Sequence, residues 1–195
     1  YHGIADVAAD SLALAIEAAK TKADIIVMAG FHFMAETSEL MSPEKSVLLP
    51  DMDAGCSLSS SVTGKDVRLL KEKYPGVPVV SYVNTSADVK AETDICCTSA
   101  NAVKIVESLG VKKVIFLPDH YLGKYVASQT DVEIIAWKGI CMVHDQFNEQ
   151  EIFDIRERNP GIKIIAHPEC PPDVIKASDF AGSTGGMIDY VKSNQ

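Results

Sequence analysis

Short apolar runs alternate with segments of helical period along the whole chain. The apolar runs are bounded by Gly, Pro or charged residues, a pattern typical of buried parallel strands. They predict strands at residues 23–30, 46–49, 77–84, 113–117, 133–136 and 163–167. The segments between them predict helices at residues 12–20, 34–41, 65–74, 87–93, 102–109, 122–129, 149–158, 172–177 and 186–192. Strands that alternate with helices in this way predict an α/β fold with parallel sheets.

A short phrase recurs three times within this pattern: an Asp, four further residues, and a hydroxyl residue that opens a helical run. The acidic residues are Asp6, Asp94 and Asp179, which follow one another at nearly equal intervals, and the hydroxyl residues are Ser11, Ser99 and Thr184. A nearly fixed period indicates one structural unit used three times. We expect each Asp to anchor the turn before a helix, and each hydroxyl residue to be the N-cap of that helix.

The period divides the chain into three repeats. The first, at residues 1–62, lacks its first strand; the second occupies residues 63–147; and the third, at residues 148–195, is partial. We therefore expect a pseudo-threefold repeat of small three-layer αβα domains. Ligands of parallel sheets bind beyond the carboxyl ends of the strands, where helix N-termini also point. Three converging helix starts would suit a substrate with several negative groups.

The repeat extends to two cysteines in glycine-containing loops. The interval from Ser11 to Cys56 is nearly the same as that from Ser99 to Cys141, whereas the same offset from Thr184 falls beyond the last residue. One thiolate from each of three units would leave one iron of a four-iron cluster open as a Lewis acid. The spacing is equally consistent with small, buried loop cysteines.

A second set of polar residues occupies matching places at the ends of two strands. Tyr82 and His167 each precede the Asp of their own repeat by the same interval, and Asn84 and Glu169 follow in the same register. Gathered around one axis, these four side chains would suit proton transfer and carboxylate recognition. Each of them taken alone is better explained by a hydrogen-bonded structural role.

The remaining candidate ligands lack such counterparts. We interpret Cys96, Cys97 and Cys170 as packing residues, because no equivalent cysteine occurs in the other repeats. His32, His120 and His144 are interpreted as solvated or core histidines.

Composition narrows the classes of partner. The net charge of −9 and the lack of basic clusters argue against nucleic acid or an anionic membrane surface as partner. No apolar run is long enough to cross a bilayer, and no secretory signal pattern opens the sequence. Five dispersed cysteines without a disulfide pattern favour a reducing, cytoplasmic location.

Eight stretches of the chain together resemble one known family. They are Ile4-Ala-Asp…Asp10-Ser-Leu, His32-Phe-Met-Ala-Glu36, Asp53-Ala-Gly-Cys-Ser-Leu58, Val80-Ser-Tyr-Val-Asn-Thr85, Thr98-Ser-Ala-Asn-Ala102, Gly139-Ile-Cys-Met-Val-His144, Ala166-His-Pro-Glu-Cys170 and Gly182-Ser-Thr-Gly-Gly186. In this order they resemble quinolinate synthase, the iron–sulfur enzyme of bacterial NAD biosynthesis. The set covers nearly the whole chain, so it is far more specific than a single glycine motif.

The resemblance implies three α/β domains around a pseudo-threefold axis, with one cysteine from each holding a [4Fe–4S] cluster. It implies the condensation of iminoaspartate with dihydroxyacetone phosphate to quinolinate, and a functional link to L-aspartate oxidase or aspartate dehydrogenase. Cys56 and Cys141 would be cluster ligands, and the open iron would bind substrate. The substrate-binding residues would be Ser11, Phe33, Tyr82, Asn84, Ser99, His167, Glu169, Ser183 and Thr184. Among these, His167, Glu169 and Tyr82 would be catalytic.

Two features of the family pattern are not found in these residues: a strand ending in a His-Asn-Tyr-Gln-like motif before Asp6, and the third cysteine. We therefore also consider a catalytically incompetent fragment, or an anion-binding module of the family without a cluster. A cluster-free lyase or aldolase acting on sugar phosphates is a third hypothesis. We expect the chain as given to be truncated at both ends.

Overall fold

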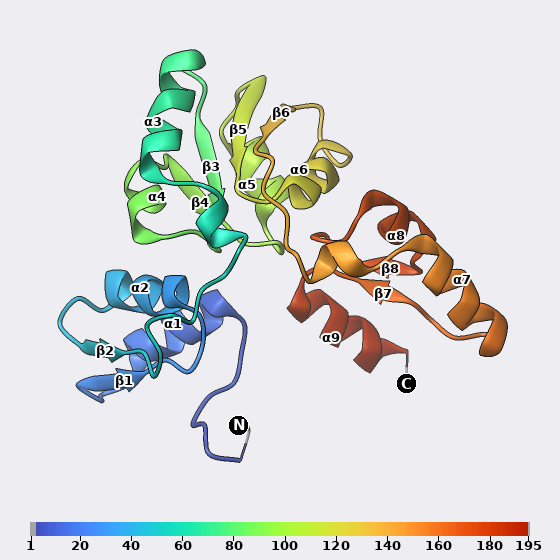
Figure 1. Ribbon diagram of the computed structural model, residues 1–195, viewed down its shortest axis with the longest axis horizontal. Helices are drawn as coiled ribbons and strands as arrows, with labels where there is room; N and C mark the ends of the chain where they lie inside the picture. Colours follow the sequence, from blue (N-terminus) through green and yellow to red (C-terminus); the bar gives the residue numbers. More distant parts are fainter. Residues whose placement is uncertain (1–2, 195) are drawn as a thin grey trace.

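The computed structural model describes residues 3–194, and its helices and strands gather in three groups (Figure 1). We call these groups the first, second and third units. All strand pairs within them are parallel, and helices alternate with strands along the chain. The α/β class with parallel sheets is therefore confirmed. None of the helices in the described residues is long and apolar enough to cross a membrane.

The first unit pairs two short strands beneath two helices (Figure 1). It comprises α1 (Ser11–Lys20), β1 (Ile25–Val27), α2 (His32–Met41) and β2 (Ser46–Leu48), followed by the short 3₁₀ helix η1 (Ser59–Ser61). Lys45 links the unit internally, because its ammonium group donates to the carbonyl oxygens of Ala18 and Thr21 at the end of α1. More than half of the surface of Ile25 and Val27 is exposed, so the outer side of this small sheet is not covered by the described residues.

The second unit is a three-layer sandwich with the largest core. Its elements are α3 (Gly64–Lys73), β3 (Val79–Tyr82), α4 (Ala87–Ala91), β4 (Ile95–Cys97), α5 (Ala102–Ser108), β5 (Lys113–Leu117), α6 (His120–Ala127) and β6 (Glu133–Ala136). The strand order is β4-β3-β5-β6. Successive strand residues face opposite sides of the sheet: Val80 and Phe116 belong to one buried cluster, and Val79 and Ile115 to another. The first cluster packs under α5 and α6, and the second packs under α3 and α4.

The third unit has the smallest described sheet. It contains α7 (Glu149–Arg158), β7 (Ile165–Ala166), α8 (Pro172–Ala177), β8 (Phe180–Ala181) and α9 (Thr184–Ser193), and it is reached through the 3₁₀ helix η2 (His144–Gln146). Ile152, Ala166, Cys170 and Val174 form its buried cluster. The division of the chain at residues 62/63 and 147/148 remains our proposed domain organisation.

Two strands of the structure were not predicted from the sequence. Both β4 and β8 lie inside the repeated phrase, directly after Asp94 and Asp179. With three and two residues respectively, they are too short to display the alternation that identifies a strand. The phrase therefore contains a strand as well as the approach to a helix.

The acidic residue of the phrase makes the same contacts in the second and third units. Asp94 accepts a hydrogen bond from the Val79 N–H at 2.8 Å, and Asp179 accepts one from the Ile164 N–H at 2.9 Å. The interval between the two donors equals the interval between the two acidic residues. Each Asp thus ties its own strand to the start of the neighbouring strand, rather than anchoring a turn before the helix as predicted.

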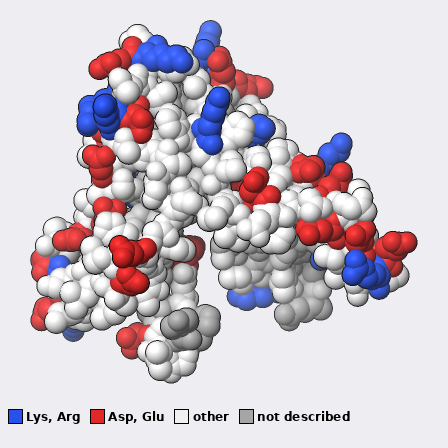
Figure 2. All heavy atoms as spheres, in the orientation of Figure 1, with Lys and Arg blue, Asp and Glu red and all other residues white. Residues whose placement is uncertain are grey.

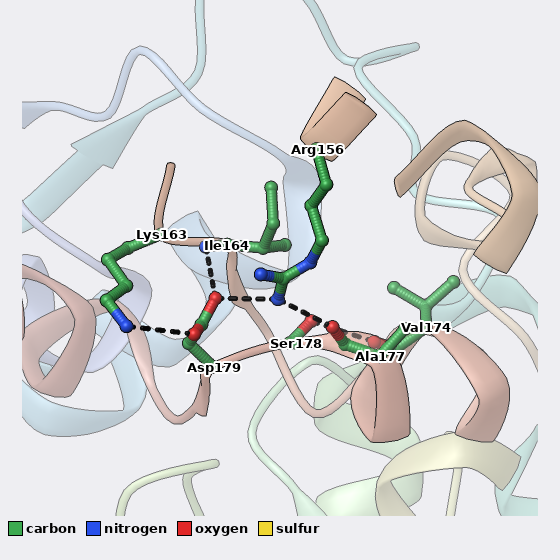
Figure 3. A network of polar contacts seen from close by, with 7 residues as sticks. All are labelled: Arg156, Lys163, Ile164, Val174, Ala177, Ser178 and Asp179. Carbon is green, nitrogen blue, oxygen red and sulfur yellow. Dashed lines mark hydrogen bonds and ion pairs between the residues drawn. The ribbon is translucent and has the colours of Figure 1, made fainter. Parts of the chain in front are cut away.

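Basic side chains complete this contact, as Figure 3 shows for the third unit. Arg156 and Lys163 lie 2.7 Å and 3.2 Å from the carboxylate oxygens of Asp179, and Arg156 also donates to the Ala177 carbonyl. In the second unit Lys71, at the position equivalent to Arg156, lies 3.4 Å from Asp94. The hydrogen bond from Ile164, with help from Lys163 and Arg156, lowers the pKa of Asp179 to about 2.

We expect Asp179→Asn to lower the thermal unfolding midpoint at pH 7 but not near pH 2. The folded-state pKa lies below the ordinary value of 3.8, so the carboxylate contributes stability above that value and loses it as the pH falls toward 2. Thermal unfolding of the wild type and the variant between pH 2 and pH 7 measures this difference. Asp189→Asn, on the exposed side of α9, makes the same change of charge as a control. An equal deficit of Asp179→Asn at both extremes would contradict this role.

Candidate functional site

Segments from all three units enclose a cavity of about 110 Å³. The start of α1, the end of β3, the loop between β4 and α5, and the start of α9 contribute to its wall. The lining residues are Asp10, Ser11, Tyr82, Val83, Thr98, Ser99, Ala100, Ser183, Thr184 and Gly185. Five of the residues predicted to bind substrate are therefore brought together here: Ser11, Tyr82, Ser99, Ser183 and Thr184. Their role in binding remains a prediction.

The helix starts at this cavity are capped one residue earlier than predicted. Asp10, not Ser11, is the N-cap of α1, and its carboxylate accepts a hydrogen bond from the Ala13 N–H at 2.9 Å. Ser183, not Thr184, is the N-cap of α9, and its hydroxyl accepts from the Gly186 N–H. A cap side chain must reach the backbone N–H three residues ahead, and these two residues have the extended backbone that permits it. The hydroxyl groups of Ser11 and Thr184 are thus not needed for capping.

Ser99 is not a cap either. Helix α5 begins at Ala102 with Asn101 as its N-cap, and the Asn101 side chain accepts from the Thr98 N–H. This contact orders the loop that carries Ser99, whose hydroxyl lies 3.0 Å from Nε2 of His167. Helices α1 and α9 therefore begin at the cavity, whereas the second unit contributes a hydroxyl-bearing loop. The prediction that Ser11, Ser99 and Thr184 are the N-caps of three converging helices was therefore wrong.

A buried network of hydrogen bonds lies beside the cavity and joins the second unit to the third. The Tyr82 hydroxyl donates to Oε1 of Glu169 at 2.9 Å, and both side chains are buried. The Glu169 backbone N–H donates to Nδ1 of His167 at 3.3 Å. Since Nδ1 accepts, the neutral ring carries its proton on Nε2 and donates it to Ser99. Tyr82, Ser99, His167 and Glu169 therefore act as one connected set.

Burial sets the protonation of this network. It lowers the pKa of His167 to about 4, with a further contribution from the neighbouring His144, so the ring is neutral at pH 7. Burial also raises the pKa of Glu169 above its ordinary value. The pKa of Tyr82 is raised well above 10, first by burial and then by the Glu169 carboxylate. A neutral imidazole that donates through Nε2, next to a carboxyl group with a raised pKa, is suited to proton transfer.

Two further residues belong to this region and were not predicted for it. His144 stacks on His167 with ring centroids 5.4 Å apart, and its Nδ1 lies 3.5 Å from Oε2 of Glu169. Asp119 is fully buried, and burial raises the pKa of its carboxyl group to about 7. The sequence signals that could have found them are the Cys141-x-x-His144 spacing and the position of Asp119 just beyond strand β5.

Asn84 and Phe33 lie outside the cavity wall. Asn84 accepts a hydrogen bond from the Ser11 hydroxyl at 3.3 Å and so connects the first unit to the second. Phe33 is buried in α2, stacks against Phe31, and has the Lys90 ammonium group 5.9 Å from its ring centre. It is not among the residues that line the cavity, and its role as a cavity wall stays a prediction.

The 3₁₀ helix η1, which follows Cys56, contacts the segment that precedes Cys141. The Trp137 indole N–H donates to the Ser61 carbonyl at 3.0 Å, and a side chain at Gly139 would clash with Ser61. Both cysteines are free and half-buried. Sγ of Cys141 belongs to a group of three potential ligand atoms, with one atom each from His144 and Glu169, all within 4.8 Å of one another.

The other cysteines pack in apolar surroundings, as predicted. Cys97 belongs to the main buried cluster and Cys170 to that of the third unit, while Cys96 packs against the main cluster. Burial raises the pKa of Cys97 to about 12.

Charged side chains lie mainly away from the junction of the units. On the face shown in Figure 2, most lysines, arginines and acidic residues project from the outer parts of the units, and the area where the units meet is largely uncharged. An anion in the cavity would therefore be held by hydroxyl and backbone N–H groups more than by basic side chains.

Comparison with known proteins shows one consistent match. The family model described as quinolinate synthetase A protein matches residues 2–195. Quinolinate synthase 2 of Mesorhizobium japonicum is 62% identical over 192 residues, which are 98% of this chain and 59% of that protein. The quinolinate synthases of Xylella fastidiosa and Caulobacter vibrioides are 59% and 61% identical over the whole of this chain, and over 58% and 54% of their own lengths. The chain thus spans a little more than half the length of these relatives.

We expect the ring of His167 to titrate near pH 4 in the folded protein. Its folded-state pKa lies below the ordinary value of 6.5, so the unfolded chain takes up a proton first and the folded state loses stability as the pH falls from 6.5 to 4. Nuclear magnetic resonance of the imidazole nitrogens measures the titration. Chemical denaturation across this range should show His167→Gln losing less stability than the wild type.

The exposed His32 supplies the matched control for this experiment. The stability difference between His32→Gln and the wild type should vary much less over the same range. A His167 ring that titrates near 6.5 would show that its burial does not control its protonation.

Proposed function

Because the chain belongs to the quinolinate synthetase A family, we propose that it takes part in forming quinolinate from iminoaspartate and dihydroxyacetone phosphate, a step of de novo NAD biosynthesis. The observation that carries this proposal is the small cavity lined by hydroxyl groups from three units, adjoining the Tyr82–Glu169–His167 network. Its chemistry matches two substrates that carry carboxylate and phosphate groups. The enzyme that supplies iminoaspartate, L-aspartate oxidase or aspartate dehydrogenase, is the functional partner in this proposal.

In this proposal the starts of α1 and α9 bind the negative groups of the substrates. Backbone N–H groups in the first turn of a helix point outward and favour anions. Thr184 adds a hydroxyl donor at the start of α9, since capping there is performed by Ser183. The hydroxyl group of Ser11 can accept from substrate while it donates to Asn84. Asn84 accepts this hydrogen bond and so holds Ser11 in position at the cavity.

The buried network would move protons. The condensation releases phosphate and water, so protons must leave carbon and reach departing oxygen atoms. His167 can donate through Nε2, and its Nδ1 is kept as an acceptor by the Glu169 N–H. Glu169, with its raised pKa and its hydrogen bond from Tyr82, can take up a proton and return it within the same site.

Two cysteines are candidates for the thiolate ligands of an iron–sulfur cluster. Cys56 and Cys141 are free, half-buried thiols that follow glycine residues in loops. The Trp137–Ser61 hydrogen bond connects the segments next to these loops. We propose that Cys56 and Cys141 are two of the ligands of a [4Fe–4S] cluster. When bound, such a cluster supplies a Lewis-acidic iron that polarises substrate oxygen or nitrogen.

The proposed function is tested by anaerobic reconstitution with iron and sulfide. We expect the wild type to gain the broad visible absorbance of a cluster, and Cys56→Ser and Cys141→Ser to lose most of the bound iron while keeping their helical content. Cys96→Ser, which changes a half-buried packing cysteine, should bind iron like the wild type. A wild-type protein that remains colourless would favour an anion-binding module without a cluster over this proposal.

Binding of dihydroxyacetone phosphate tests the anion pocket separately from the cluster. We expect Thr184→Val to weaken binding about 5- to 10-fold, because one hydrogen bond to a ligand is worth about 1 kcal/mol. The helix should persist, because Ser183 is the cap. Isothermal titration calorimetry provides the dissociation constant. Thr21→Val, at the far end of α1, makes the same substitution as a control, and equal affinities of the two variants would contradict the assignment.

A further inference from the structure

Lys90 lies at the junction of the first and second units and has no part in the function proposed above. It is a half-buried residue of α4, the helix that follows β3 along the chain. Its ammonium group donates to the carbonyl oxygens of Val83, at 2.9 Å, and of Thr85. The ring of Phe33, on α2 of the first unit, is centred 5.9 Å from Nζ. The two carbonyl oxygens belong to the neighbours of Asn84, so Lys90 fixes the backbone on both sides of that residue.

The backbone bend that carries Asn84 is held from two directions. On the side of the sheet, the Val83 N–H donates to the Cys97 carbonyl at 2.9 Å. On the side of α4, Lys90 donates to the carbonyl oxygens before and after Asn84. The side chain of Asn84 faces Ser11 of the first unit, whose hydroxyl donates to Oδ1 at 3.3 Å. Because Val83 and Ser11 both line the cavity, the position of this bend sets part of the cavity wall.

The first unit in turn fixes the helix that carries Lys90. Oε2 of Glu36, on α2, accepts a hydrogen bond from the Ala87 N–H at the start of α4 at 3.0 Å. Phe33 and Glu36 are three residues apart on α2, so they lie on the same side of that helix. Figure 1 shows α2 next to α4. Contacts from α2 to α4 and from α1 to Asn84 therefore meet at one short part of the second unit.

The charge of Lys90 strengthens its two hydrogen bonds. Burial lowers the pKa of Lys90 to about 8, while Cys96 and Glu36 act in the opposite direction, so the side chain is charged at pH 7. An ammonium group that loses hydration needs hydrogen-bond acceptors, and the two carbonyl oxygens provide them. Charge-assisted hydrogen bonds are stronger than neutral ones, so the bend is held more firmly than a neutral donor would hold it.

From these contacts we infer that Lys90 is a positioning residue of the anion pocket, which holds Asn84, and through it Ser11, at the cavity wall. The inference rests on the proposed function, in which the start of α1 binds a negative group of the substrates. Lys90 is not among the residues that line the cavity, so its effect on substrate affinity must pass through Asn84.

The test is isothermal titration calorimetry of the full chain with dihydroxyacetone phosphate and, separately, with quinolinate. We expect Lys90→Met, which keeps an unbranched side chain without N–H donors, to weaken binding of at least one of them about 5- to 10-fold, the effect of losing one hydrogen bond to a ligand. Lys104→Met, on the exposed side of α5, is the matched control and should retain wild-type affinity. Circular dichroism and thermal unfolding check that each variant is folded.

A double-mutant cycle separates positioning from a general loss of stability. If Lys90 acts through Asn84, the variant with both Asn84→Ala and Lys90→Met should bind no more weakly than Asn84→Ala alone. The effect of Thr184→Val, at the start of α9, should instead add to that of Lys90→Met. Should Lys90→Met fail to fold, Lys90→Gln, which is uncharged and one bond shorter, takes its place in the cycle.

The side-chain amide of Asn84 gives a second readout that needs no substrate. Its nuclear magnetic resonance signals in the ligand-free protein should shift in Lys90→Met and stay in place in Lys104→Met. A wild type that binds neither ligand refutes the proposed pocket, and the amide signals then decide whether Lys90 holds Asn84. The inference is overturned if Lys90→Met leaves both affinities unchanged, if its effect adds fully to that of Asn84→Ala, or if the amide signals do not move.

Discussion

The hydrogen bond from Tyr82 to Glu169 is the contact on which the arrangement of the site depends. It joins residues 87 positions apart and connects the last residue of β3 to the loop after β7. A carboxyl group as deeply buried as that of Glu169 needs a partner, because an unpaired one would lose the free energy of its hydration. The burial that makes the bond necessary also lowers the pKa of His167 and raises that of Glu169. Docking of the third unit onto the second and the protonation of the site are therefore coupled.

Residues at matching positions of the second and third units are alike at some positions and different at others. Asp94 and Asp179 make the same contact, because each ties two parallel strands together. In each unit a basic residue, Lys71 or Arg156, pairs with the Asp from the same distance along the sequence. Tyr82 and His167 occupy equivalent positions yet differ in chemistry, as do Asn84 and Glu169. Equivalent backbone positions thus deliver different side chains to one junction. A scaffold repeated in this way can hold an asymmetric substrate, because each unit contributes a different polar group.

Much of the fold was predictable from local pattern. The strands at 113–117 and 133–136 and the helices at 149–158 and 172–177 were predicted with the bounds that the structure has. Strand β5 is a continuous apolar run that is buried on both faces. Helices α7 and α8 are amphipathic, and each buries one side in the core of the third unit. The misplaced caps at Ser11 and Thr184 are errors of a single residue, since adjacent polar residues compete for the same backbone N–H groups. Strands β4 and β8 were missed because two or three residues cannot display a period.

The sequence by itself determined the α/β class, the family motifs and the set of hydroxyl, histidine and carboxyl residues from which a site could be built. Only the tertiary structure decided that Ser99 meets His167 from a distant part of the chain, that Nδ1 of His167 is an acceptor, and that His144 faces Glu169. The physical reason is the range of the interactions. Periodicity and capping are local patterns of a few residues. They indicate which face of a segment is buried and where the segment ends. Which buried faces meet, and hence which side chains lose water together, depends on how whole units pack against one another.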